Sequence, residues 1–395
     1  MKRSIPFYLA LFITVRTITN TMVRMTYPFL PVFSRGLGVS IGMLSFGITL
    51  RQASGLLGPI LASVGDSYGR KAGMLFGIAL FTAGAAVILI WPSYLAFVLM
   101  MILGIMANFV FVPSMQAFLS DRVPYRQRGM ALGLTELGWS LAYIFGIAIA
   151  GFLINRFGWQ APFPWLFATG VLVIVILGLV LPSDIPAAGQ RAGLIGNLKQ
   201  VFSSASARAA FVFALALSGA NEMINITFAV WLEDAFQVKI AALAATAVVI
   251  GLSELSGEAS ASFLSDRLGK HRAPGAGIIL NILAALALPL LGRSLWGAMA
   301  GLFLIYLSFE FTLVSSLPLA SEVLPAARAT LMAVYIACMG FGRALGASAA
   351  SLLYSWGSGW LPQDLPGILP VVIAAALVGL LALAALRLIQ TQVQE

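Results

Sequence analysis

Charged side chains are scarce in this sequence: Asp, Glu, Lys and Arg make up only 9% of its 395 residues. A soluble domain carries about 25%, so a soluble fold of this chain would lack the polar residues needed to cover its surface. Hydrophobic residues make up 60% of the chain, and the mean hydropathy is +0.98. The composition therefore indicates an integral membrane protein, whose surface can be apolar where it meets lipid.

Cysteine and histidine are almost missing. The one cysteine, Cys338, excludes an intramolecular disulfide, and the one histidine, His271, belongs to a basic loop. The sequence shows no Ser/His/Asp set, no cluster of metal ligands, no Walker loop and no appended soluble domain. We therefore expect no cofactor, no metal and no catalytic activity, so the chain is not predicted to be an enzyme.

The basic residues lie in short loops between apolar segments. The net charge of +9 would suit a nucleic-acid partner, but this placement is the pattern of membrane topology, and we predict no nucleic-acid binding. Lys2 and Arg3 followed by residues 5–15 resemble a signal peptide, but Arg16 interrupts the apolar run and no cleavage site follows. We interpret this segment as an uncleaved first helix.

Apolar runs of about 20 residues, the length needed to cross a bilayer, occur twelve times. The expected spans are 6–33, 40–64, 72–91, 94–119, 128–155, 162–182, 207–232, 240–264, 273–292, 295–320, 327–354 and 366–388. The one long polar connection, residues 183–206, is predicted to be a cytoplasmic linker between residues 1–182 and 207–395.

Lys and Arg in the loops predict the orientation. Fifteen of these residues fall on one side of the predicted spans, and only four fall on the other, namely Arg35, Arg156, Lys239 and Arg293. Because positive charge stays on the cytoplasmic side, both termini are predicted to be cytoplasmic in a multi-pass protein of the cell membrane.

Two charged strings, residues 65–71 and 265–271, follow the pattern Asp-x-x-Gly-basic and stand 200 positions apart. A second echo is shifted by 201: Ser120-Asp121 recurs as Ser321-Glu322. A fixed period of this length predicts that one six-helix half occurs twice. Many secondary transporters are built in this way around a site near the membrane midplane.

At these strings the chain resembles the major facilitator superfamily, over essentially its whole length. The family signature between helices 2 and 3 is Gly-x-x-x-Asp-(Arg)-x-Gly-Arg-Arg/Lys. The residues that match it are Asp66, Gly69, Arg70 and Lys71 in the first copy and Asp266, Arg267, Gly269 and Lys270 in the second. The resemblance implies an all-α fold of twelve transmembrane helices in two pseudo-symmetric halves, and a small-molecule substrate.

The chain is otherwise similar to the drug/proton antiporter branch, with two departures. Met100 stands where that branch tends to carry Arg in helix 4. Residues 146–151 keep the small residues of the branch's Gly-Pro-x-x-Gly-Gly motif but have no proline.

The signature loops predict a conformational latch. An Asp at a helix end can accept hydrogen bonds from exposed backbone N–H groups and pair with a basic residue of the other half. The residues assigned to the latch are Asp66, Gly69, Arg70, Asp266, Arg267 and Gly269. The alternative is that these charges only set the topology.

Away from the loops and helix ends, nine ionisable residues lie within predicted spans, where each costs at least about 2.5–3.5 kcal/mol. They are Arg16, Arg24, Arg51, Glu136, Glu222, Glu254, Glu258, Glu310 and Arg343. Together they must face a polar cavity or pair with one another. The first half holds three Arg and one Glu, and the second holds four Glu and one Arg, so the signs segregate.

These residues supply the candidate site for substrate or protons: Arg16, Arg24, Arg51, Glu136, Glu222, Asn225, Glu254, Glu310 and Arg343. Glu254 and Glu258 share a helix face and cannot easily both ionise, and Glu222 and Asn225 share another. Carboxyls that can exchange a proton suit proton coupling. The Arg residues could instead bind an anion, since a guanidinium matches carboxylate and phosphate, or neutralise the carboxylates. Glu258 is expected to be a structural ion-pair partner.

The leading interpretation is a proton-coupled secondary transporter of small organic molecules, a monomer and an exporter, that works by alternating access. A second interpretation is a uniporter or uptake carrier for an anionic metabolite. A third, from another class, is a membrane receptor without transport or catalysis. The sequence does not identify the substrate.

Overall fold

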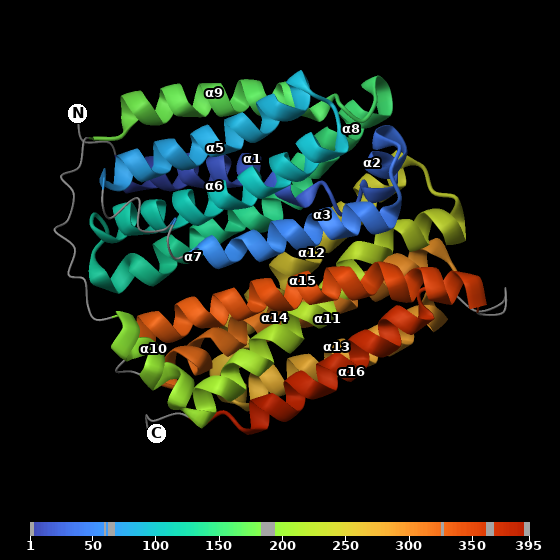
Figure 1. The fold of residues 1–395 in the computed structure, drawn as a ribbon. Helices are drawn as coiled ribbons and strands as arrows, with labels where there is room; N and C mark the ends of the chain where they lie inside the picture. The colour runs from blue at the N-terminus through green and yellow to red at the C-terminus, as the bar shows by residue number, and fades with distance from the viewer. Residues whose placement is uncertain are drawn as a thin grey trace. The chain divides into compact units, whose positions relative to one another are not determined.

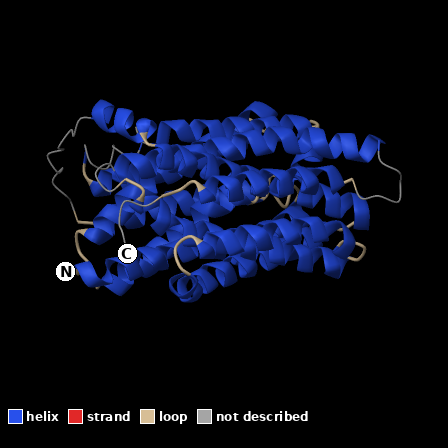
Figure 2. Cartoon of the chain, turned by 90° about the horizontal axis from the view of Figure 1, so that it is seen from below, coloured by secondary structure: helices blue, strands red, loops and turns tan. Residues whose placement is uncertain are grey.

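The computed structural model describes residues 4–58, 61, 68–182, 194–324, 328–360 and 367–390. In these ranges all regular secondary structure is helical, as Figure 2 shows. The predicted all-α fold is confirmed. Asp66 and residues 183–193 of the predicted linker lie outside the described residues, and so does the side chain of Asp266.

The helices follow the predicted spans, except for the helix of residues 194–203, which lies within the predicted linker 183–206. They are α1 (Ile5–Arg24), α2 (Leu30–Leu37), α3 (Ile41–Ala53), η1 (Ser54–Leu57), α5 (Arg70–Ile90), α6 (Tyr94–Ser120), α7 (Tyr125–Leu141), η2 (Ala142–Gly146), α8 (Ile147–Phe157), α9 (Pro162–Val180), α10 (Leu194–Ser203), α11 (Ala205–Phe236), α12 (Ile240–Leu268), α13 (Arg272–Leu291), α14 (Leu295–Glu322), α15 (Arg328–Trp360) and α16 (Leu369–Arg387). The segments α7, η2 and α8 run on as one long helix interrupted by a π turn.

Ten helices of the described residues are long and apolar enough to cross a bilayer, or eleven if the bent pair α2 and α3 counts as one span. The 20-residue α1 is also long enough to cross, but Arg16, Asn20 and Arg24 lower its hydropathy. The observed number is roughly consistent with the predicted twelve.

Proline ends α1. Pro28 has no N–H group, and the Tyr27 N–H bonds the Arg24 carbonyl at 3.2 Å instead of the Val23 carbonyl four residues back. The chain then turns and resumes as α2, so the first predicted span, 6–33, is a broken helix. The Val23 carbonyl is left for a side-chain donor.

The chain forms two compact units. Unit 1 holds Met1–Ser40, Leu50–Gln190 and Ile240–Gly251, and unit 2 holds Ile41–Thr49, Arg191–Lys239 and Leu252–Glu395. Both α3 and α12 contribute residues to each unit. The division into halves 1–182 and 207–395 stays a prediction.

Each unit has its own core. In unit 1, Tyr8 and Phe12 of α1 pack edge-on against Phe118 of α6. In unit 2, α11 and α15 lie side by side along much of their length (Figure 1). Their buried residues, with those of α16, make up most of its core cluster.

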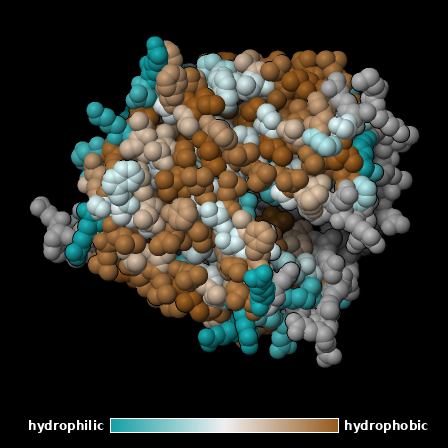
Figure 3. Space-filling view, turned by 180° about the vertical axis from the view of Figure 1, so that it is seen from behind, coloured by the Kyte–Doolittle hydropathy of each residue, from teal (hydrophilic) through white to brown (hydrophobic). Residues whose placement is uncertain are grey.

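Large apolar side chains are also exposed, among them Ile90 and Leu179, each 83% exposed. Figure 3 shows apolar residues over most of one face, with hydrophilic residues mainly toward its margins. Such a surface is unfavourable in water and suits contact with lipid tails. The pattern supports the composition argument for a multi-pass membrane protein.

Candidate functional site

The predicted site residues are divided between the two units: Arg16, Arg24, Arg51 and Glu136 lie in unit 1, and Glu222, Asn225, Glu254, Glu310 and Arg343 lie in unit 2. In unit 1, a polar stripe runs along one face of α1, because Arg16, Asn20 and Arg24 are spaced by four residues. Each of these side chains donates a hydrogen bond to a backbone carbonyl of α7. The acceptors are Thr135 O at 3.0 Å, Gly138 O at 3.2 Å and Trp139 O at 3.0 Å, respectively.

Glycine lets α1 approach α7 this closely. A methyl group on Gly138 would lie 2.6 Å from the Arg16 Cβ and 3.0 Å from the Ile13 carbonyl oxygen. At Gly146 it would overlap the hydroxyl of Thr21. These two glycines therefore place the α1 donors within reach of the α7 carbonyls.

Arg16 and Glu136 form an ion pair. The two guanidinium nitrogens lie 2.6 and 2.8 Å from the two carboxylate oxygens, and Arg16 is only 5% exposed. Gln116 of α6 also reaches Glu136, at 3.5 Å. The sequence left open whether the Arg residues bind an anion or neutralise a carboxylate; for Arg16 the structure shows neutralisation.

Arg24 lies between two aromatic rings. Its guanidinium carbon is 4.1 Å from the Trp139 ring centroid and 3.6 Å from that of Tyr143. Cation–π contacts of this kind stabilise a desolvated guanidinium by about 2 kcal/mol. The contact of Trp139 and Tyr143 with Arg24 depends on the packing of α7 and η2 against α1.

The π turn η2 was not predicted from the sequence. The Ile147 N–H donates to the Ala142 carbonyl, five residues back, within the long helix of α7, η2 and α8. The turn carries Tyr143, which faces Arg24, and it begins three residues after Trp139. The turn ends at Gly146, the first residue of the motif that lacks proline, so the helix is interrupted here without a proline.

Arg51 is 1% exposed and is fixed to the broken end of α1. It donates to the Val23 carbonyl at 3.1 Å and to the Tyr27 hydroxyl. The Tyr27 ring also stands 5.1 Å from its guanidinium carbon. The predicted site residue Arg51 thus satisfies the Val23 carbonyl, whose usual partner, the Tyr27 N–H, bonds the Arg24 carbonyl instead.

In unit 2, Glu222 of α11 is fully buried and accepts a hydrogen bond from the Asn225 amide at 3.1 Å. The Asn225 carbonyl oxygen accepts one from the Tyr306 hydroxyl of α14. The predicted pair is therefore confirmed as a contact. Because the phenol donates to the amide oxygen, the amide N–H is turned toward Glu222.

Glu254 and Glu310 are also buried, at 3% and 7% exposure. Glu310 lies where α14 crosses α12, because a methyl group on Gly257 would be 2.9 Å from its Cβ and 2.6 Å from the Leu307 carbonyl oxygen. Arg343 of α15 is half-buried, and no hydrogen bond or ion pair joins it to another described residue.

Glycine contacts hold α11 on α15 beside Glu222. A methyl group on Gly342 would overlap the Leu215 carbonyl oxygen. One on Gly346 would overlap the Gly219 carbonyl oxygen and lie 3.1 Å from the Glu222 Cβ. The depth at which Glu222 is buried is therefore set by a backbone contact between two helices.

The signature glycines adopt the same backbone conformation in both copies. Gly69 has φ 97° and ψ 154°, and Gly269 has φ 89° and ψ 154°. This region is essentially restricted to glycine. Each glycine stands between a span and the helix that follows it, α5 or α13, so the duplicated motif needs glycine to turn the chain there.

In each unit, the signature loop contacts the second repeated motif, which contains Asp121 or Glu322. Arg70 lies 3.8 Å from Asp121 in unit 1, and Lys270 lies 3.0 Å from Glu322 in unit 2. In unit 1 the pair joins the signature loop before α5 to the end of α6, and in unit 2 it joins the signature loop before α13 to the end of α14. Arg267 is exposed in the last turn of α12. The sequence alone did not pair the two echoes.

We expect Gly269→Ala to lower the free energy of unfolding by about 1–3 kcal/mol, because alanine is strained at this φ and ψ. The matched control is Gly178→Ala in α9, where an added methyl group meets no atom within 4 Å. Denaturant titration in micelles measures both variants. Equal stability of the two would contradict a conformational requirement at Gly269.

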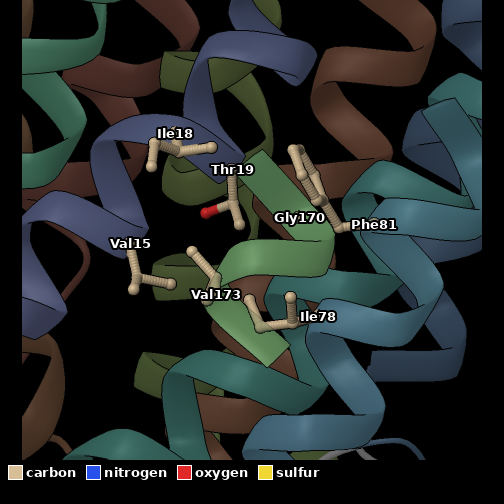
Figure 4. A pocket seen from close by; sticks show the side chains of 7 residues that line it. All are labelled: Val15, Ile18, Thr19, Ile78, Phe81, Gly170 and Val173. Carbon is tan, nitrogen blue, oxygen red and sulfur yellow. The ribbon is translucent and has the colours of Figure 1, made fainter. Parts of the chain in front are cut away.

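A narrow crevice lies between α1, α5 and α9 of unit 1 (Figure 4). Seven residues line it, Val15, Ile18, Thr19, Ile78, Phe81, Gly170 and Val173. The only polar side chain is Thr19, whose hydroxyl bonds the Arg16 carbonyl at 3.3 Å. None of the predicted site residues lines this crevice, so it is an imperfection of helix packing rather than a substrate site.

The family model of the Major Facilitator Superfamily matches residues 12–347. The uncharacterized MFS-type transporter YceJ of Bacillus subtilis is 26% identical over 348 residues, 87% of this chain and 88% of that protein. The multi-drug resistance efflux pump PmrA of Streptococcus pneumoniae is 24% identical over 271 residues, 65% of this chain and 66% of the pump.

Among solved structures, a bacterial homolog of the human lysosomal transporter Spinster superposes with a TM-score of 0.75 at 16% sequence identity. The match covers 98% of this chain and 95% of the homolog. At this identity it shows a shared fold.

Proposed function

Because the chain belongs to the Major Facilitator Superfamily and is a membrane carrier rather than an enzyme, we propose that it exchanges small organic molecules for protons by alternating access. We further propose export as its direction, and a monomer in the cell membrane with both termini cytoplasmic. The efflux pump among its relatives supports export.

The observation that carries this proposal is the burial of Glu222 in a membrane helix, with an oriented amide from Asn225 as hydrogen-bond donor. A buried carboxyl needs partners of this kind, and a carboxyl that can exchange a proton suits proton coupling. Alternating access changes the surroundings of residues near the middle of the membrane. Glu222 and Glu310 are the proposed proton carriers, and Glu254 is the next candidate.

The test begins with a ligand-stabilisation screen on the purified protein at several pH values. A compound that raises the melting temperature is then loaded into proteoliposomes with and without a pH gradient. Accumulation only with the gradient supports proton coupling. Equilibration that is indifferent to the gradient would contradict it.

A second candidate is a uniporter or uptake carrier for an anionic metabolite. Arg24 favours it, because two aromatic rings hold its guanidinium in a fixed orientation inside a span. Against it, Arg16 already pairs with Glu136. Stabilisation by carboxylates rather than by cations in the same screen would support this candidate.

The proposed orientation has its own test. With Cys338 replaced by Ala, we expect Lys239→Cys to react with a membrane-impermeant maleimide on intact cells, and His271→Cys to react only after lysis. Both positions are exposed, and the loop charges place them on opposite sides. Labelling in the reverse order would overturn the topology.

The latch also remains a proposal. The ion pairs of Arg70 and Lys270 join neighbouring segments of the same unit. These ion pairs would hold each signature loop within its own unit. A latch between the halves would therefore have to be formed by Asp66 and Asp266.

A further inference from the structure

The internal repeat extends to the first helix of each half. At the offset of 201, Asn20 corresponds to Asn221, Met22 to Met223, Thr26 to Thr227 and Thr17 to Ser218. The stretch 17–27 of α1 is therefore the counterpart of 218–228 of α11. Differences between the two copies show where the halves have taken different roles.

In the first copy, Thr17 and Asn20 are satisfied within unit 1, whereas the buried Thr26 Oγ1 bonds no described residue. Asn20 donates to the Gly138 carbonyl at 3.2 Å, and the Thr17 hydroxyl donates to the Ile13 carbonyl at 2.9 Å. Both bonds support helix packing. The repeat itself therefore gives these positions ordinary structural partners.

In the second copy, neither position is satisfied. The Asn221 Oδ1 and the Ser218 Oγ are buried, and no described residue bonds to either atom. Asn221 is 5% exposed and Ser218 is fully buried. Buried polar atoms without a partner are rare and costly, so each one calls for an explanation.

These atoms share one face of α11 with Glu222 and Asn225, because 218, 221, 222 and 225 are spaced by three and four residues. That face is directed toward α14 and α15: Asn225 bonds Tyr306, and the Glu222 Cβ lies against Gly346. Within unit 2, two unpartnered oxygens therefore stand beside a buried carboxyl.

We propose that Asn221 and Ser218 form a subsite that accepts hydrogen bonds from an N–H donor of the transported molecule, with an ammonium group as the preferred donor. The Asn221 Oδ1 can only accept, and the Glu222 carboxyl on the same face favours positive charge. This inference rests on the proposed transport function and names its substrate class. Asn20, the repeat counterpart, is structural.

The test compares two probes of equal charge, 2-phenylethylammonium and its N,N,N-trimethyl analogue, which has no N–H. Equilibrium binding to the purified full-length protein is measured without a gradient. We expect the wild type to bind the primary ammonium about tenfold more tightly, since a site with buried acceptors discriminates against a ligand that cannot donate.

Three variants separate recognition from folding. Asn221→Leu should weaken only the primary ammonium and bring the two affinities together, whereas Asn221→Asp, which keeps an acceptor, should restore the preference. The matched control Asn20→Leu should lower the melting temperature and leave the ratio of affinities unchanged. A wild type without preference, or binding neither probe, would overturn the subsite, as would a preference that survives in Asn221→Leu.

The subsite proposal and the proton-coupling proposal are tested by separate measurements, so either can be contradicted without the other. The ratio of the two probe affinities is measured without a pH gradient, so the result for the subsite holds even if the protein proves to be a uniporter. Coupling is measured in proteoliposomes by imposing a gradient of the trimethyl probe and recording the internal pH. This probe has no proton to lose, so a pH change must come from protons that the protein carries. No pH change would contradict coupling and leave the subsite intact.

Discussion

Replacing Glu222 or Glu310 by Gln is expected to abolish accumulation driven by a pH gradient while exchange of substrate across the membrane persists. Gln keeps the size of the side chain, and at position 222 its carbonyl oxygen can still accept from Asn225, but it cannot carry a proton. One pH unit is worth about 1.4 kcal/mol, or about tenfold accumulation for one proton exchanged per substrate. Each variant should lose this whole factor.

The measurement is uptake of a stabilising compound into proteoliposomes at fixed pH differences, beside counterflow without a gradient. Glu258→Gln is the matched control, because Glu258 lies one turn from Glu254 on the same helix and is expected to be structural. It should keep gradient-driven accumulation. If both Glu222→Gln and Glu310→Gln concentrate substrate with an unchanged pH profile, proton coupling through these carboxyls is wrong and the uniporter interpretation gains support.

Gly342→Ala is expected to give the largest loss of stability. Its methyl group would overlap the Leu215 carbonyl oxygen, which belongs to the backbone of α11 and cannot rotate away. Overpacking of this kind costs about 1–3 kcal/mol, and more where the backbone has to move. Because Gly346, one turn later, packs against Glu222, separation of α11 and α15 should also impair transport.

Gly359→Ala is the matched control on the same helix, since an added methyl group there meets no atom within 4 Å. Alanine is the better helix former, so this variant should be neutral or more stable by up to about 1 kcal/mol. Unfolding in mixed micelles measures both free energies. A Gly342 variant as stable as the Gly359 variant would mean that α11 and α15 do not pack through these glycines.

Several features of the site followed from spacing along one helix. Glu222 and Asn225 were paired because residues three apart share a face, and that contact is present. The glycines of the duplicated motif were found from the period of 200, and both adopt the same glycine-only conformation. In such cases the interacting groups are neighbours in the sequence, so the geometry of a single helix or turn decides the outcome.

Other features depended on which helices pack together. Arg16 and Glu136 lie 120 residues apart, and nothing in their local sequences singles out one as the partner of the other. The sandwich of Arg24 between Trp139 and Tyr143 also requires α1 to lie on α7 in one particular register. The π turn that presents Tyr143 carries no proline to mark it.

The sequence by itself determined the membrane character, the helical fold and the repeat, because hydropathy and period are sums over many residues and tolerate local variation. Only the tertiary structure decided which polar groups are satisfied. Asn20 and Asn221 are the same residue at equivalent places, yet one bonds a carbonyl of α7 and the other bonds no described residue. The physical reason is that a buried hydrogen bond needs a partner within about 3 Å, and that distance is set by the packing of a second helix.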